Sequence, residues 1–528
     1  AYPGTLKLDV DARDIERRIV RVREEIPVVA GPLTLLYPQW LPGKHAPRGQ
    51  IDKLAGLSLS ADGRALAWRR DPLDVHAFHL DVPPGVDRVL AEFEYLSPQD
   101  AEQGRVVMTP DMLNLQWETV VLYPAGYRAD GIEVAARARL PAGWRHAGAL
   151  DVASSAVDGE GAVVFAPVSL ETLVDSPLFA GRHFRRIDLG KAGGAPVFLN
   201  LVADDARDLA ATPEQVRPHA NLVVQAQRLF GTRHFKRYDF LLALTDQLGG
   251  IGLEHLASSE NTRPPGYFSD WNKHMPGRDL LPHEFVHSWN GKFRRPMGLA
   301  TPNYNVPMQG DLLWLYEGQT EYWGQVLAAR AGLWTEAQAR EALAEVAARY
   351  TDGRPGFAWR GLQDTTNDPV VAARRPRAFR SWQMSEEYYS AGQLLWLAVD
   401  AKLREISRER RSLDDFARGF FGDGVDPVAR DYEFDDVVAA LDRVASHDWA
   451  GFLRSRLDAH APPLDGLAAS GWKLAYADTP GAFHRLEQAN RKQADHAASI
   501  GLVVGSDDGR IRDVRWEGPA FRAGLAPG

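Results

Sequence analysis

The chain has 528 residues, which is more than one typical domain, so two to four domains are expected. Its 45% hydrophobic and 25% charged residues are typical of a globular protein, and its formal net charge of −9, without long basic runs, indicates no nucleic-acid partner. No apolar stretch reaches about 18 residues, so no membrane span is expected, and the absence of cysteine leaves histidine and carboxylate side chains as the plausible metal ligands.

The first 170 residues predict a domain rich in β-strands. Residues 6–10 and 90–95 alternate apolar and polar side chains with the two-residue period of a half-buried strand. Turn signals such as Ala-Asp-Gly at 61–63 separate these runs. No cluster of chemically reactive residues stands out in this region.

Residues 171–400 mix strand and helix signals. A helix is predicted to begin at Pro213, because Thr212 is a suitable N-cap and proline suits the first helical position. It is expected to end near Phe230, before Gly231. Residues 238–244 form an apolar run that predicts a buried strand.

A glycine-rich stretch, residues 249–254, follows that strand. Gly250 and Gly252 would let a substrate backbone approach closely, as an added strand does. Glu254 comes directly after them. Taken alone, the stretch also fits a glycine-rich turn followed by a surface glutamate, but the next motif, about 30 residues on, favours a role at a site.

Residues 283–287 read His-Glu-Phe-Val-His. Positions i and i+4 of a helix lie on one face, so His283 and His287 would project together and suit a tetrahedral zinc ion. Glu284 could hold a water molecule against the metal and take its proton. Pro282 suits the opening turn of such a helix. The alternative is two surface histidines on an ordinary helix.

Candidates for a third ligand lie about 30 residues further on. Glu317 and Glu321 are again four residues apart, in an aromatic segment that includes Trp314 and Tyr322. A carboxylate buried among these side chains is costly unless it meets a cation, and zinc is such a cation. The residues themselves leave open which glutamate is the ligand.

The remainder of the chain is predicted to be mainly helical up to residue 485. Residues 351–382 are rich in Gly, Pro, Asp and Arg, which predicts a loop that could edge a cleft. Tyr389 lies near the start of a helix expected to run to about Ile406, and its neighbour Tyr388 competes with it as the candidate site tyrosine. From about residue 493 the pattern returns to short strands, at 500–504 and 511–514.

These motifs carry a family resemblance. H-E-x-x-H followed by W-L-x-E-G resembles the gluzincin metallopeptidases, in particular the M1 aminopeptidases. Residues 249–254 resemble their G-x-M-E-N substrate-binding strand, and residues 389–392 resemble their Y-x-x-G helix start. Residues 518–525 resemble the G-P-A-x-x-A-G-L signature of bacterial PDZ domains. The combination, with a histidine-to-glutamate gap longer than in M1 enzymes, is similar to the M61 family of glycyl aminopeptidases over essentially the whole chain.

The resemblance implies a multidomain α+β fold. Its parts would be an N-terminal β-sheet domain (1–170), a thermolysin-like zinc catalytic domain (171–400), a helical region (401–485) and a partial PDZ-like β segment (493–528). It implies that one zinc ion is held by His283, His287 and Glu317, with alignment on W-L-x-E-G favouring Glu317 over Glu321. The other roles that it implies are the general base for Glu284, the hydrogen-bond donor to the reacting carbonyl for Tyr389, and substrate binding for Gly250, Gly252 and Glu254, with Glu254 at the free amine.

We therefore expect a zinc aminopeptidase that acts on peptides with a free N-terminus, and the resemblance implies a preference for Gly or Ala at that position. Two alternatives stay open, namely an endopeptidase with the same zinc chemistry and a non-catalytic PDZ-bearing binding or chaperone protein. A periplasmic or secreted location is expected, because the chain begins Ala-Tyr-Pro without Met and the family it resembles is bacterial.

Overall fold

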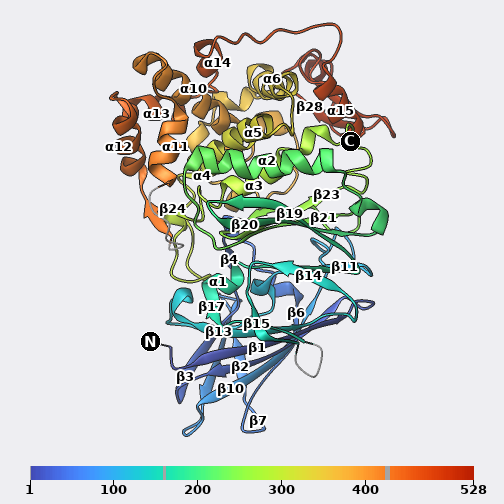
Figure 1. Cartoon of the computed structure of the whole chain (residues 1–528), viewed down its shortest axis with the longest axis vertical. Coiled ribbons are helices and arrows are strands. Elements are labelled where there is room, and N and C mark those ends of the chain that lie inside the picture. Colours follow the sequence, from blue (N-terminus) through green and yellow to red (C-terminus); the bar gives the residue numbers. More distant parts are fainter. Residues whose placement is uncertain (1, 158–161, 423–428) are drawn as a thin grey trace.

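The computed structural model describes residues 2–157, 162–422 and 429–528. Its N-terminal part consists mainly of strands and forms one end of the molecule (Figure 1). The largest sheet there confirms the predicted β-rich region, and the two-residue period shows in the burial of Leu6, Leu8 and Val10. Its strands lie in the order β15 (Val152–Val157), β16 (Ala162–Phe165), β13 (Glu133–Arg139), β1 (Thr5–Asp14), β2 (Ile19–Pro27), β10 (Arg88–Leu96), β6 (Leu54–Ala61) and β7 (Arg64–Ala65), with β17 (Val168–Ser169) on β13.

A second N-terminal sheet packs with the first around one apolar core, which includes Tyr37, Phe78 and Trp117. Its strands are β12 (Tyr123–Pro124), β3 (Gly31–Leu36), β9 (Ala77–Val82) and β8 (Trp68–Arg70). Two short strands, β4 (Trp40–Leu41) and β5 (Ala46–Pro47), form a hairpin beside it. The Gln39 and Trp40 amides donate to the Tyr304 carbonyl at 3.1 and 2.7 Å, so this hairpin is fixed against the catalytic region.

The catalytic sheet lies between helices and a small N-terminal sheet. Its order is β19 (His183–Ala192), β20 (Ala195–Ala203), β21 (Tyr238–Leu244), β23 (Ser258–Arg263) and β22 (Gly252–Glu254). Strand β21 is buried at every residue because Phe240 and Leu242 face the helices, whereas Leu241 and Ala243 face the small sheet. The small sheet has the order β11 (Met112–Leu115), β18 (Leu178–Gly181) and β14 (Arg145–Gly148), and the short helix α1 (Leu170–Val174) precedes β18.

Helices cover the other face of the catalytic sheet (Figure 1). The first begins and ends as predicted: Thr212 and Gln215 form a capping box, and Gly231 ends the helix in the left-handed conformation. The helices nearest the sheet and the site are α2 (Pro213–Phe230), α3 (Leu280–Val286), α4 (Leu313–Tyr316), α5 (Gly318–Ala331), α6 (Glu336–Asp352) and α10 (Ser390–Ser407). In the described part of the chain, no helix combines the length and apolar composition needed to cross a membrane.

Residues 351–382, predicted as a loop, contain single helical turns separated by irregular backbone. These are α7 (Leu362–Thr365), α8 (Asp368–Val371) and α9 (Arg380–Gln383), which begins in this stretch. The expected helices after α10 are present as α11 (Leu413–Phe421), α12 (Phe434–Val444) and α13 (Trp449–Leu457), followed by α14 (Asp465–Ala469) and α15 (Ala482–Arg491). Strands β24 (Arg294–Pro296) and β25 (Arg430–Tyr432) pair across this region.

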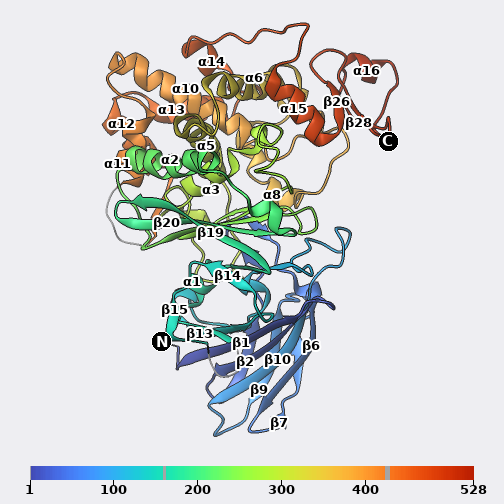
Figure 2. The same cartoon turned by 45° about the vertical axis from the view of Figure 1, so that its right-hand side comes forward.

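The C-terminal residues form a small antiparallel sheet at the edge of the helical part (Figure 2). It consists of β26 (Gln493–His496), β27 (Leu502–Gly505) and β28 (Ile511–Val514), followed by the turn α16 (Pro519–Arg522). The predicted fold class is confirmed as a multidomain α+β protein with an N-terminal β-sheet domain, a helical catalytic region and a small C-terminal sheet. The predicted domain boundaries and the PDZ assignment of the last segment stay predictions.

Candidate active site

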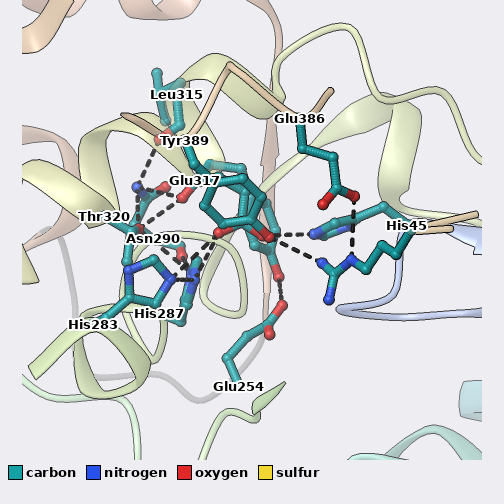
Figure 3. Close-up of polar contacts among 12 residues, drawn as sticks. His45, Glu254, His283, His287, Asn290, Leu315, Glu317, Thr320, Glu386 and Tyr389 are labelled. Atoms are coloured by element: carbon teal, nitrogen blue, oxygen red, sulfur yellow. Dashed lines mark hydrogen bonds and ion pairs between the residues drawn. The ribbon is translucent and has the colours of Figure 1, made fainter. Parts of the chain in front are cut away.

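Three potential metal-ligand atoms converge at the C-terminal end of α3 (Figure 3). The predicted helix brings His283 and His287 together, with their Nε2 atoms 3.2 Å apart. Glu317 lies between α4 and α5, and its Oε2 is 3.2 Å from Nε2 of His287 and 3.5 Å from Nε2 of His283. Zinc bonded at about 2.0–2.1 Å in a tetrahedron would separate its ligand atoms by about 3.3–3.4 Å, so the three observed distances fit this ion.

The hydrogen bonds of the two imidazoles support a cation at this point. Nδ1 of His287 donates to the backbone carbonyl of Asn290 at 2.9 Å, and Nδ1 of His283 donates to Oε2 of Glu321 at 2.9 Å. In the neutral imidazoles each Nε2 then presents a lone pair, and the two lone pairs and a carboxylate oxygen face one another. The lone pairs and the carboxylate charge repel one another unless a cation lies between them. The geometry thus favours Glu317 over Glu321 as the third candidate ligand, while Glu321 is hydrogen-bonded to His283 and can orient it.

Asn290 holds the ligand-bearing elements together (Figure 3). Its buried amide donates to the carbonyl oxygens of Leu315 and Tyr316 at 3.0 and 3.2 Å, and to Oγ1 of Thr320 at 3.0 Å. Its own carbonyl accepts from His287. One side chain and its backbone therefore fix the second histidine relative to the segment that carries Glu317.

The second oxygen of Glu317 is bonded to a residue of the N-terminal part. Nε2 of His45 donates to Oε1 of Glu317 at 2.8 Å, across 272 residues of sequence (Figure 3). His45 lies between β4 and β5 in the left-handed conformation, with φ of 50°, which is uncommon for a residue other than glycine. Sequence reasoning missed His45, because no local pattern marks a histidine whose partner lies so far along the chain.

Glu284 is the buried carboxyl next to the first histidine. It is 4% exposed and lines the cleft, and burial raises its pKa to about 7. A Cβ atom at Gly252 would lie 2.5 Å from its Oε1 and 2.7 Å from Leu280, so only glycine lets β22 pass this close. The predicted role of Gly252, to let a substrate backbone approach, stays a prediction.

Glu254 ends β22, the edge strand of the catalytic sheet, and its side chain is buried in the cleft wall. Tyr316 donates a hydrogen bond to its Oε1 (Figure 3). One ring nitrogen of His287 and one carboxylate oxygen each from Glu254 and Glu284 lie within 4.8 Å of one another. Gly250, by contrast, does not line the cleft, and its predicted role in substrate binding stays a prediction.

The two candidate tyrosines have different surroundings. Tyr388 is fully buried, whereas Tyr389 lines the cleft and its ring lies 6.2 Å from that of His283. The Tyr389 hydroxyl accepts a hydrogen bond from Arg374 at 3.1 Å. Tyr389 therefore faces the metal-ligand group from the start of α10, and Tyr388 belongs to the core.

One cleft contains these groups. Its volume is ≈ 450 Å³, and acidic side chains and metal-ligand candidates share it with four arginines of the segment 374–380. The predicted loop therefore does edge the cleft. The lining consists of Gly43, Gly252, Glu254, His283, Glu284, His287, Glu317, Arg374, Arg375, Pro376, Arg377, Arg380, Ser385, Glu386 and Tyr389.

Solved structures share this fold. An aminopeptidase N family protein from Idiomarina loihiensis has a TM-score of 0.78 at 18% identity, over 99% of this chain and 88% of its own. An M1 zinc metallopeptidase from Deinococcus radiodurans has a TM-score of 0.53 at 14% identity, over 87% and 95%. A mutant of an M1 zinc metallopeptidase from the same organism, bound to a Tyr-Ser-Ala substrate, has a TM-score of 0.52 at 12% identity, over 91% and 96%. No curated protein matches the sequence.

Two family models match the sequence itself. The model described as M61 glycyl aminopeptidase matches residues 277–395, which carry the metal-ligand candidates and Tyr389. The model described as Peptidase M61 N-terminal domain matches residues 7–182. The matches together span more than half of the chain and include most of the N-terminal sheets and the three metal-ligand candidates. The chain therefore belongs to the M61 glycyl aminopeptidase family and is a metallopeptidase.

Proposed function

We propose that this protein is a zinc aminopeptidase that removes the N-terminal residue of peptides and prefers Gly or Ala at that position. The observation that carries the proposal is that Glu254 shares one cleft with His283, His287 and Glu317. A carboxylate there can bind the substrate's ammonium group while the next peptide bond lies at the metal ligands. The preference for a small first residue rests on the description of the family as glycyl aminopeptidases.

Different residues of the cleft have different roles in hydrolysis. His283, His287 and Glu317 would hold zinc, which when bound polarises the scissile carbonyl and acidifies water. Glu284 takes a proton from the attacking water and returns it to the leaving amine, for which a pKa near neutrality is suitable. Tyr389 donates its hydroxyl proton in a hydrogen bond to the carbonyl oxygen as that oxygen gains charge.

The edge position of β22 suits a substrate that adds a strand. In the described part of the chain β22 pairs with β23 alone, and its other edge is available for backbone hydrogen bonds to a peptide. Glu254 at the end of this strand would limit the peptide to one residue before the scissile bond. This limit distinguishes an aminopeptidase from an endopeptidase with the same metal chemistry.

The test compares glycyl p-nitroanilide with its N-acetylated twin, using zinc-loaded protein and the variant Glu254→Gln. We expect cleavage of the free-amine substrate alone, and a loss of about 10–100-fold in kcat/KM in the variant, since a charged hydrogen bond of ~1.5–3 kcal/mol is removed. Glu336→Gln, which changes an exposed glutamate on α6, is the matched control.

Two other outcomes would contradict the proposal. Equal cleavage of both twins would favour an endopeptidase in which Glu254 has a structural role. Cleavage of neither, with zinc bound, would favour the non-catalytic binding protein. The periplasmic or secreted location is independent of this test and stays a prediction.

A further inference from the structure

One segment of the cleft lining is rich in arginine. Residues 374–380 read Arg-Arg-Pro-Arg-Ala-Phe-Arg and contain no acidic residue. All four of their arginines line the cleft, namely Arg374, Arg375, Arg377 and Arg380. We call this stretch the arginine segment.

Two of these guanidinium groups are already paired. Nε of Arg374 is 3.1 Å from Oε1 of Glu386, and Arg374 also donates to the Tyr389 hydroxyl. Arg377 lies 3.3 Å from Oδ2 of Asp368, a buried carboxylate that Arg360 also contacts. Both arginines therefore have defined structural partners.

The other two guanidinium groups, those of Arg375 and Arg380, form no ion pair with a carboxylate of the described residues. Both side chains belong to exposed residues on the cleft wall. An arginine presents up to five N–H donors in a planar fork that matches a carboxylate. The segment thus brings two guanidinium groups without a paired carboxylate among the described residues to the cleft.

The arginine segment lies close to the reacting groups. Arg374 is hydrogen-bonded to Tyr389, and Tyr389 packs beside His283, so one side chain separates the segment from the metal-ligand group. Figure 3 shows Glu386 and Tyr389 on the side of the site away from Glu254. The cleft therefore holds both a carboxylate that can bind an ammonium group, Glu254, and arginines that can bind an anion.

Contacts with the C-terminal part hold the segment in place. The ring of Phe379 lies 5.5 Å from that of Trp516 and 5.7 Å from that of Phe521, and Trp382 stacks on Trp516 at 5.4 Å. The Trp516 amide donates to Oγ of Ser381 at 2.9 Å. The arginines are thus presented from a packed segment, which lowers the entropy lost when they bind a ligand.

We infer that Arg375 and Arg380 form a carboxylate-binding subsite on the C-terminal side of the scissile bond. The cleft would then favour short peptides that carry a carboxylate just after the bond that is cut. This inference rests on the proposed aminopeptidase function. The carboxylate has two possible sources, the C-terminus of a di- or tripeptide and an Asp or Glu side chain.

The experiment measures kcat/KM of the zinc-loaded protein for four peptides: Gly-Ala, Gly-Ala-amide, Gly-Glu-amide and Gly-Gln-amide. The peptides form two pairs, Gly-Ala with its amide and Gly-Glu-amide with Gly-Gln-amide. In at least one pair we expect kcat/KM to be about tenfold higher, equivalent to ~1.4 kcal/mol, for the peptide with the carboxylate. The first pair reports a terminal carboxylate and the second a side chain. Added salt should reduce the preference, because both arginines are exposed to solvent.

Variants assign the effect to the subsite. Arg375→Gln and Arg380→Gln should each reduce the preference severalfold, and Arg375→Glu should favour Gly-Lys-amide over Gly-Gln-amide. Arg207→Gln is the matched control, since Arg207 is 90% exposed and pairs with Asp205 outside the cleft. Melting temperatures show whether each variant is folded.

The outcomes separate this inference from the proposed function. Cleavage of all four peptides with equal kcat/KM within each pair would overturn the subsite and leave the aminopeptidase intact. A preference that both Gln variants retain would also overturn it. Cleavage of none of the peptides would contradict both proposals.

Discussion

At the scale of single residues, each candidate metal ligand is held by polar contacts with neighbouring groups. Each histidine donates its Nδ1 proton to a fixed oxygen, and each oxygen of Glu317 faces a nitrogen. Such outer partners fix the orientation and the protonation of ligands, so they contribute to metal affinity without touching the metal. His45 is the partner that comes from the N-terminal sheets.

Replacement of this histidine should therefore weaken zinc binding. His45→Phe removes the donor to Glu317 but keeps a ring in the buried space, and we expect a loss of about 10–100-fold in zinc affinity. The measurement is a competition titration with a zinc chelator, which requires no activity. His79→Phe, a change of another hydrogen-bonded histidine in the same part of the chain, is the control. Equal zinc affinities of His45→Phe and the wild type would contradict this role.

At the scale of elements, two helices must meet closely to assemble the site. A Cβ atom at Gly392 of α10 would lie 2.8 Å from Cα of Gly318 at the start of α5. Glu317 immediately precedes Gly318, and Tyr389 caps α10. The close contact between these two glycines places Glu317 and Tyr389 in one cleft. It thus gives a physical reason why the E-G and Y-x-x-G motifs occur in the same chain.

Elements with local signals could be predicted from the sequence. The capping residues of α2 and α6, the apolar run of β21 and the H-E-x-x-H spacing all lie within a few residues of the structure that they specify. The candidate metal ligands and the residues Glu254 and Tyr389, all of which the structure brings into one cleft, were singled out for the same reason. Each lies in a short motif that resembles a known family.

Features made by distant contacts could not be predicted. His45 acts on Glu317 across 272 residues, and the hydrogen bonds of Asn290 depend on how α3 and α4 pack. The sequence predicts that the loop with the arginine segment edges a cleft, but the packing of this segment against Trp516 has no local signal. The single turns between 351 and 382 are shorter than the windows in which helical periodicity can be recognised.

At the scale of the whole molecule, the cleft is built from parts far apart in the chain. The hairpin β4–β5 reaches it from the N-terminal sheets, and the C-terminal sheet supports the arginine segment from the edge of the helical part (Figure 2). Changes at the C-terminal end should therefore affect peptide selection without affecting the metal.

The test of this coupling is Trp516→Ala. The variant removes the ring that packs on Phe379 and Trp382, so the arginine segment should be less ordered. We expect a severalfold smaller preference for carboxylate-bearing peptides and an unchanged zinc affinity, measured with the four peptides and the chelator titration. Trp472→Ala, which removes a half-exposed tryptophan elsewhere, is the control. An unchanged preference would show that the C-terminal sheet does not support the subsite.

The measurement that tests the account most directly is the zinc content and the activity of Glu284→Gln. Glu284 lies next to the proposed metal ligands but is not one of them, so we expect the variant and the wild type alike to bind one zinc ion per chain. Turnover of glycyl p-nitroanilide should fall by about 10²–10⁴-fold, the usual contribution of a general base. A variant that binds zinc and keeps wild-type turnover would contradict the assignment of this cleft as the active site.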